Sequence, residues 1–243
     1  MRLLALDTAT SAITAAVHDG DRVLASRTVP DPRRTTELLA PLLRDVLTEA
    51  GTRPEEVTRV AAGTGPGPFT GLRVGLVTAR TMAHVNGTTV LGVCSLDALA
   101  EAARRAGARG ELLVASDARR KEVYWARYSC TEEDVTAIDE PAVTRPADLP
   151  EVVRALPTVG RGPLLYPELL TAAPGPEVLD VDAAVLADLA VARLTAGEDM
   201  PAEPLYLRRP DTAAPAPPKS VIAPVPQRNQ APHVGGGAEQ VQQ

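Results

Sequence analysis

The sequence contains few aromatic residues: one Phe, one Trp and four Tyr among 243 residues. A core of this size must therefore be built from aliphatic side chains, chiefly Leu, Val and Ala. Cysteine is equally scarce, since Cys94 and Cys130 are the only two and they do not form a C-x-x-C pair. This pattern excludes a disulfide framework and a cysteine-based zinc site.

Histidines and long apolar runs are also missing where function would need them. His18, His84 and His233 lie far apart and show neither metal-ligand spacing nor a Ser/His/Asp or Cys/His arrangement. We therefore expect no metal site and no catalytic residues. No apolar run reaches the length of a membrane span, and the first run is interrupted at Asp7, too early for a signal peptide. A cytoplasmic protein without a membrane partner is expected.

The charge balance is acidic, with a net charge of −6 at pH 7. Phosphate contacts in nucleic-acid binding proteins need Lys and Arg. An acidic chain is poorly suited to holding nucleic acid alone, so we expect any RNA to be bound through a partner.

The most distinctive stretch is Gly63–Gly87, GTGPGPFTGLRVGLVTARTMAHVNG. Its Gly- and Pro-rich loop leads directly into a helical pattern that Thr70 is placed to cap. The loop resembles a phosphate loop, but no Lys-Ser/Thr pair follows the glycines, and Pro66 and Pro68 have no N–H to donate. The pattern favours a stiff turn that directs the helix.

One face of this helix carries almost no side chain, because small residues recur at i, i+4 spacing: Gly71, Gly75, Ala79 and Ala83. Such a face lets another backbone approach closely. Spacing alone favours the protein's own sheet as that backbone, and a helix of another subunit is the alternative. Arg73 and Arg80 lie on other faces, where we expect them only to be solvated.

The first half of the chain reads as an alternation of strands and helices. Apolar runs and turn residues predict strands, and a 3.6-residue period predicts helices. The helix over 35–50 has a broad apolar stripe that includes Leu38, Leu42 and Val46. The expected order is strands 2–8, 13–18 and 22–29, helix 35–50, strand 59–63, the helix from Thr70, strand 89–93 and a helix over 96–106 capped by Ser95.

The second half repeats the opening of the first. Strand 111–116 ends at a carboxylate, Asp117, just as the first strand ends at Asp7, and a polar turn leads to strand 122–129. Helices are expected over 146–156 and 182–196. This recurrence indicates a duplicated fold.

The tip of the first hairpin offers a weak nucleotide-site hypothesis. Backbone N–H groups and hydroxyls at such a tip can hold a phosphate, and Asp7 could hold a hydrated Mg²⁺. The alternative is a polar turn in which Asp7 bonds to its own backbone. The candidate residues are Asp7, Thr8, Thr10 and Ser11.

The strand over 122–129 carries half of the aromatic residues, namely Tyr124, Trp125 and Tyr128. Stacking of bases on this strand is conceivable, but packing within the sheet is the more usual role of such residues. We expect the basic segment Arg119–Lys121 beside them to be a solvated turn.

Four segments resemble the bacterial TsaB family, once called YeaZ. In chain order they are LALDTATSAITAAV, GTGPGPFTGLRVGLVTARTMA, DARRKEVYWARY and PLYLRRP. They span all of the chain except the last 34 residues, and GPGPFTGLR is the most specific of them.

The resemblance implies an α/β fold of the actin/Hsp70/sugar-kinase (ASKHA) type, with two duplicated ribonuclease-H-like domains whose mixed sheets are flanked by helices. The first domain would be 1–107 and would carry the partner surface, and the second would be 108–209. The last helix and PLYLRRP would return to the first domain. Residues 210–243 are rich in Pro and Gly and are expected to be a disordered tail.

The resemblance also implies a role in tRNA modification. The chain would be a noncatalytic scaffold and activator in the formation of threonylcarbamoyladenosine, next to the anticodon of tRNAs reading codons that start with A. It would bind TsaD, the transferase, together with the ATPase TsaE, and would form a homodimer without TsaD. Contact with tRNA would be indirect, and ATP or ADP with Mg would bind only in the partner-completed complex. Many family members carry a His where this chain has Thr35, which argues against a metal there.

The expected partner surface consists of the two helices, 35–50 and 70–86. Its residues are those of the leucine stripe and of the bare face: Leu38, Leu42, Val46, Gly71, Gly75, Ala79 and Ala83. The competing hypothesis is a small ATP-binding phosphotransferase of the same fold, resting on Asp7, Thr10 and Asp117.

Overall fold

The first sheet contains five strands in the order β3-β2-β1-β4-β5. In this computed structural model, which describes residues 1–208, β1 and β2 form an antiparallel hairpin, and β4 and β5 continue the sheet parallel to β1. The strands are β1 (Leu3–Asp7), β2 (Ile13–His18), β3 (Val23–Val29), β4 (Arg59–Gly63) and β5 (Val90–Val93).

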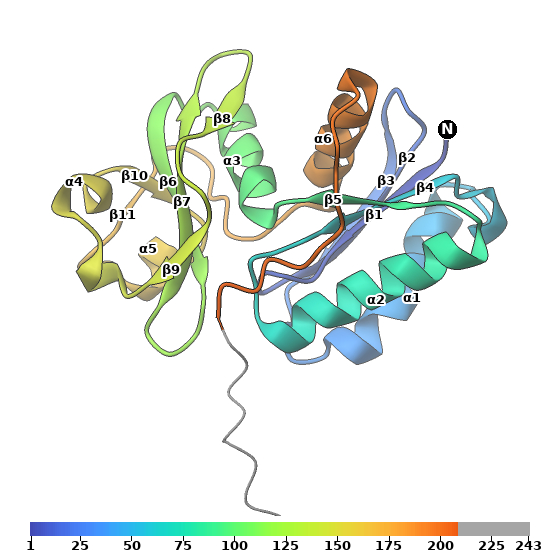
Figure 1. The fold of residues 1–243 in the computed structure, drawn as a ribbon, viewed down its shortest axis with the longest axis horizontal. Helices are drawn as coiled ribbons and strands as arrows, with labels where there is room; N and C mark the ends of the chain where they lie inside the picture. Colours follow the sequence, from blue (N-terminus) through green and yellow to red (C-terminus); the bar gives the residue numbers. More distant parts are fainter. Residues whose placement is uncertain (209–243) are drawn as a thin grey trace, which may run out of the picture. The chain divides into compact units, whose positions relative to one another are not determined.

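Helices cover both faces of this sheet. Helices α1 (Thr35–Glu49) and α2 (Phe69–Val85) lie together on one face, and α6 (Ala183–Ala196) lies on the other (Figure 1). All five residues of β1 are buried, because successive side chains of a strand point to opposite faces and both faces are covered. Leu4 and Leu6 pack into the core beneath α1 and α2.

The second sheet has the strand order β11-β10-β6-β7-β8, with β9 also paired to β7. Helix α3 (Ser95–Arg105) packs on β6 and β7 and contacts α6. The long strands of this sheet are β6 (Gly110–Asp117) and β7 (Val123–Cys130). The remaining elements of the chain have two to four residues each: η1 (Pro54–Glu56), β8 (Val135–Ala137), β9 (Ala142–Thr144), η2 (Pro146–Asp148), α4 (Glu151–Arg154), β10 (Pro157–Val159), α5 (Gly162–Leu165) and β11 (Thr171–Ala172).

Both sheets open with the same local structure. The Asp7 Oδ1 accepts a hydrogen bond from Ala9 N at 2.8 Å, and the Asp117 Oδ1 accepts one from Arg119 N at 2.7 Å. In each sheet the strand that ends at the aspartate pairs with the next strand in an antiparallel hairpin. The predicted fold class, ASKHA-type α/β with mixed sheets flanked by helices, is confirmed.

The domain boundaries remain a prediction, although α6, late in the chain, packs on β1, β2 and β3 of the first sheet. The predicted tail over 210–243 lies outside the described residues. Within residues 1–208, no helix combines the length and the apolar character that crossing a bilayer requires.

Three local predictions were wrong. Residues 146–156 form a 3-10 turn and one helical turn, η2 and α4, because Pro150 forces Leu149 into an extended conformation between them. Thr70 does not cap α2, whose N-cap is Pro68. Ser95 does not cap α3 either, since its hydroxyl is bonded to Asp7.

The N-cap of α6 provides a test of the local structure. The Asp182 Oδ1 accepts a hydrogen bond from Ala184 N at 2.8 Å. Asp182→Ala should lower the free energy of unfolding by about 1 kcal/mol, because an orphan N–H of the helix loses its acceptor. Urea denaturation measures this change. Asp182→Asn keeps the acceptor and should cost much less, so an equal loss in both variants would contradict the capping role.

Candidate functional site

The Asp7 carboxylate is enclosed by the protein. Its side chain is about 1% exposed, and Oδ2 accepts a hydrogen bond from Ser95 Oγ at 2.6 Å. Gly63 lies directly against it, so a Cβ at that position would overlap Oδ2. Burial raises the pKa of Asp7, and the hydrogen bonds from Ser95 and Ala9 oppose that rise. The arrangement is the polar turn that the sequence left as an alternative to a Mg²⁺ ligand.

The other three candidates at the hairpin tip also contact neighbouring segments. Thr8 Oγ1 donates to the Gly71 carbonyl at 2.7 Å, and Thr10 Oγ1 accepts from Val181 N at 3.4 Å. Ser11 N donates to the Asp180 carboxylate at 3.0 Å. The tip therefore joins α2 to the segment that precedes α6. Their assignment to a nucleotide site remains a prediction.

A small polar cleft opens beside this tip, with a volume of about 150 Å³. Thr8 and Thr10 line it, whereas Asp7 does not. Arg33, before α1, and Arg119, in the β6–β7 turn, are its cationic residues. Across residues 1–208, no group of three or more His, Cys, Asp or Glu side chains is placed to hold a metal.

The bare face of α2 packs inside the protein. A Cβ on Gly75 would overlap Thr8 Oγ1, and a Cβ on Gly71 would lie 2.7 Å from the Thr8 carbonyl oxygen. Ala79 is 0% and Ala83 3% exposed. Internal packing is therefore correct, and the placement of these four residues on a partner surface was wrong. The small side chains let α2 lie against β1.

The predicted residues of α1 are largely internal too. Val46 and Leu42 belong to the same core, with 0% and 6% exposure, although Leu42 also lines a groove beside β3. Leu38 is half-buried and lines the same groove, which has a volume of about 330 Å³. Val46 was thus wrongly placed on the partner surface, because its side chain lies in the core. For Leu38 and Leu42 that placement remains a prediction.

An apolar groove between α1 and α2 faces outward instead. It has a volume of about 530 Å³ and opens between the two helices and the 51–54 turn. Val77 and Val85 of α2 are 61% and 76% exposed. We refer to this feature as the α1–α2 groove; its lining residues are Ala40, Leu43, Arg44, Leu47, Thr48, Gly51, Thr52, Arg53, Pro54, Thr78 and Met82. Sequence reasoning missed the groove because its members come from different segments.

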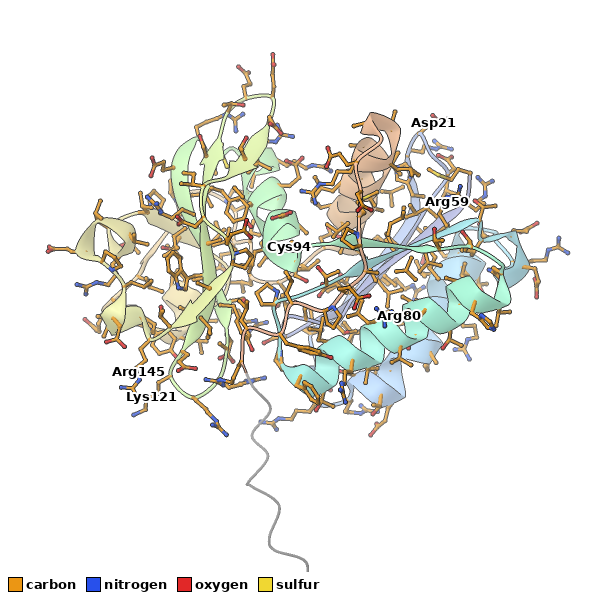
Figure 2. The ribbon with its side chains drawn as sticks, in the orientation of Figure 1. Asp21, Arg59, Arg80, Cys94, Lys121 and Arg145 are labelled. Atoms are coloured by element: carbon orange, nitrogen blue, oxygen red, sulfur yellow. The ribbon has the colours of Figure 1, made fainter. Side chains whose placement is uncertain are left out.

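Residues 200–208 run back along the first sheet. Gly92 N donates to the Met200 carbonyl at 2.9 Å, and Leu205 N donates to the Thr64 carbonyl at 2.9 Å. Arg80 donates to the Ala202 carbonyl at 2.8 Å, and Figure 2 shows its side chain on this side of α2. The expectation that Arg80 is only solvated was therefore wrong.

The same segment explains the two most distinctive motifs. The Phe69 ring of GPGPFTGLR lies 5.2 Å from the Tyr206 ring of PLYLRRP, between centroids. The Arg73 guanidinium lies 3.9 Å above the Phe69 ring and donates to Tyr206 OH at 3.2 Å. The two motifs are contact partners, and Arg73 too has a structural role rather than a solvated one.

The packing of α2 leads to a mutational prediction. Gly75→Val should lower the free energy of unfolding by roughly 1–3 kcal/mol, because the added side chain overlaps Thr8 in a packed core. Val77→Ala, two residues away on the exposed face, is the matched control and should change it by less than about 0.5 kcal/mol. Chemical denaturation compares them, and a Gly75→Val protein as stable as the parent would refute this packing.

The enclosed carboxylate predicts a pH dependence. The folded-state pKa of Asp7 lies above its unfolded value, so the folded protein binds more protons in the window between the two values. The contribution of Asp7 to stability is thus largest below the unfolded pKa and is lost as pH rises toward the folded pKa. As pH rises, the free energy of unfolding of Asp7→Asn should increase relative to that of the parent, because the variant buries no charge. That of Ser95→Ala should decrease relative to the parent, because the ionised carboxylate loses a hydrogen bond. Urea denaturation from pH 3 upward tests both; parallel curves for Asp7→Asn and parent would contradict the raised pKa.

Comparison with known proteins identifies the family. A family described as TsaD, tRNA N6-adenosine threonylcarbamoyltransferase, matches residues 29–156. The chain is 36% identical over 174 residues to the tRNA threonylcarbamoyladenosine biosynthesis protein TsaB of Escherichia coli, covering 70% of this chain and 75% of that protein. An uncharacterized protein of Mycobacterium tuberculosis is 39% identical over 215 residues, which cover 86% of this chain and 92% of that protein.

Solved structures agree with these relatives. The structure of YeaZ from Pseudomonas aeruginosa superposes with a TM-score of 0.72 at 32% sequence identity, covering 85% of this chain and 99% of that one. The resemblance of the four sequence segments and the match of the whole fold point to the same group of proteins. The chain belongs to the TsaB (YeaZ) family.

Proposed function

We propose that this chain is a noncatalytic subunit in the biosynthesis of threonylcarbamoyladenosine in cytoplasmic tRNA, and that it acts by binding the transferase TsaD. The names of its relatives from Escherichia coli and Haemophilus influenzae support the process. The match of residues 29–156 to the TsaD family supports a paralogous relationship between the two proteins. Subunits of related fold commonly associate through equivalent surfaces, as in symmetric dimers.

The α1–α2 groove is the observation that carries the partner hypothesis. Leu43 and Leu47, which are 6% and 4% exposed, form its floor together with the half-buried Met82. The widely exposed apolar side chains of α2 are Val77 and Val85. Burying such a surface against a partner supplies hydrophobic free energy, and methionine adapts its shape to the facing side chains. Arg44 and Arg53 also line the groove and would provide polar contacts around the apolar centre.

The same groove serves two alternative assemblies in this proposal. A second copy of the chain would occupy it in a homodimer when TsaD is absent, and TsaD would displace that copy. TsaE would join only the complex with TsaD. The partner surface would then belong to the first of the two proposed domains, 1–107.

The enclosure of the Asp7 carboxylate at the hairpin tip supports a noncatalytic role. A phosphotransferase resting on Asp7 would need that carboxylate to reach a metal or a substrate, yet Ser95 and Gly63 enclose it. Asp117 is paired with Arg119 at 2.8 Å. Any ATP or ADP with Mg would bind, in this proposal, at a site completed by the partner.

Two substitutions in the groove test the interface. Ala40 is exposed and Thr78 half-buried, so Ala40→Arg with Thr78→Arg places two charges in the groove without disturbing the core. We expect TsaD to bind at least roughly tenfold more weakly, because an unpaired charge would be desolvated at the contact. Isothermal titration calorimetry with purified TsaD measures the affinity.

The matched control is Val152→Arg on helix α4, where the side chain is 72% exposed. It should leave the affinity for TsaD unchanged. Unchanged affinity in the groove variant would refute the proposed interface. A reconstituted tRNA threonylcarbamoylation assay with TsaD and TsaE tests the function itself; full activity without this chain would refute it.

A further inference from the structure

The turn between β6 and β7 holds three consecutive cations in an unfavourable backbone conformation. Arg119, Arg120 and Lys121 have φ angles of 62°, 52° and 64°. Glu122 N donates to the Arg119 carbonyl at 2.9 Å, so Arg120 and Lys121 are the central residues of a turn with positive φ at both positions. These are the features of a type I′ turn, where Asn-Gly is strongly preferred. Residues whose backbone is held in such a strained conformation cluster at functional sites, including ligand-binding surfaces.

Further basic residues surround this turn. The β7–β9 register, with Val123 opposite Thr144, places Arg145 beside it, and Figure 2 shows Lys121 and Arg145 close together. Arg208 donates to the Ala118 carbonyl at 2.9 Å, and Arg33 lines the same cleft as Arg119. We call these six residues the basic end: Arg33, Arg119, Arg120, Lys121, Arg145 and Arg208.

Within residues 1–208, some members of the basic end are bonded to carboxylates. Asp117 pairs with Arg119, Glu122 pairs with Arg208, and Asp31 accepts from the backbone N of Arg33. Asp117 and Glu122 each face one arginine side chain, whereas Asp31 meets only a backbone N–H, and the group lies on a chain whose net charge is −6. The basic end thus departs from the overall charge balance. Lys121 and Arg145 are both exposed, so their charges are presented to solvent.

We propose that the basic end binds the phosphate backbone of RNA directly. Arginine forks and a lysine ammonium match phosphate oxygens, and hydroxyls of Thr8, Thr10 and Thr70 line the adjoining cleft. Tyr124 and Tyr128 are 5% and 2% exposed, and Trp125 is half-buried against the core of the second sheet, so this strand offers no open stacking platform for bases. Binding therefore relies on phosphates and is independent of sequence.

The choice of RNA over another polyanion rests on the proposed function, whose substrate is a tRNA. The interface with TsaD is a separate surface, made by α1 and α2. The chain would thus hold the enzyme through the groove and the tRNA backbone through the basic end. This proposal replaces the expectation that contact with tRNA is purely indirect.

A variant that removes the charge while favouring the turn tests the proposal. Lys121→Gly with Arg145→Gln removes two exposed charges, and glycine suits the positive φ of residue 121, so the Tm should stay close to that of the parent. Its affinity for unmodified tRNA should fall roughly tenfold at about 50 mM salt, and the slope of log K against log [salt] should fall by about 0.7–0.9 for each phosphate that the variant no longer neutralises. Fluorescence anisotropy with the full chain measures both quantities.

The matched control removes two charges elsewhere. Arg22→Asn with Arg59→Asn changes residues of the β2–β3 turn and the start of β4, and Figure 2 shows Arg59 far from Lys121. This control should bind tRNA as the parent does. Equal weakening in both double variants would show that net charge alone matters and would overturn the proposal. So would an absence of binding by the parent at about 100 μM protein, the weak limit of nonspecific association.

Two further measurements separate the alternatives. If polyglutamate competes for the basic end as well as tRNA does, the partner is an acidic protein surface and the RNA proposal is wrong. The variant Lys121→Gly with Arg145→Gln should still bind TsaD normally, whereas the groove variant should still bind tRNA. A basic-end variant that loses tRNA binding but keeps TsaD binding would thus support this inference. The groove variant tests the proposed function separately, through its affinity for TsaD.

Discussion

The contact on which most of the structure depends is the approach of the β1–β2 hairpin tip to helix α2. Thr8 lies against Gly71 and Gly75, close enough that either glycine with a Cβ would overlap it. The Thr8 hydroxyl also donates to the Gly71 carbonyl, so the contact is bonded as well as packed. This approach sets the position of α2 on the sheet, and with it the direction of the exposed face of the helix.

The same contact explains why Asp7 is enclosed. Bringing α2 and its preceding loop close to the hairpin places Gly63 against the carboxylate, and Ser95 supplies a hydroxyl that satisfies it. A buried carboxylate with bonded oxygens is tolerated, whereas one without partners would carry a large desolvation cost. The Asp7 side chain thereby links the end of β1 to the start of α3 and to the end of β4.

Within residues 1–208, the α1–α2 groove and the basic end both face outward, and they differ in chemistry. The α1–α2 groove is apolar and suits a folded protein partner, while the basic end is cationic and suits an anionic chain. Residues 200–208 link the regions: Tyr206 packs on Phe69 of α2, and Arg208 reaches the β6–β7 turn. A subunit that brings an enzyme and an RNA together would need surfaces of these two kinds.

The sequence by itself determined the elements whose signals are local. Strand 59–63, helix α6 and the two aspartate-ended hairpins lie where the apolar periodicity and the turn residues predicted them, because burial of one face and turn conformation depend on neighbouring residues. The family and the fold class also followed from the sequence, since the distinctive motifs survive as contiguous segments.

Only the tertiary structure decided which faces are free. The bare stripe of α2 and the leucine stripe of α1 are compatible with internal or external packing, and the hairpin tip, distant in sequence, occupies the first of them. The caps predicted at Thr70 and Ser95 failed for a similar reason, because Pro68 starts α2 and Asp7 engages the Ser95 hydroxyl. The groove is assembled from separate segments, so no local pattern could reveal it. The sequence marks the basic run Arg119–Lys121, but not the residues that the fold gathers around it.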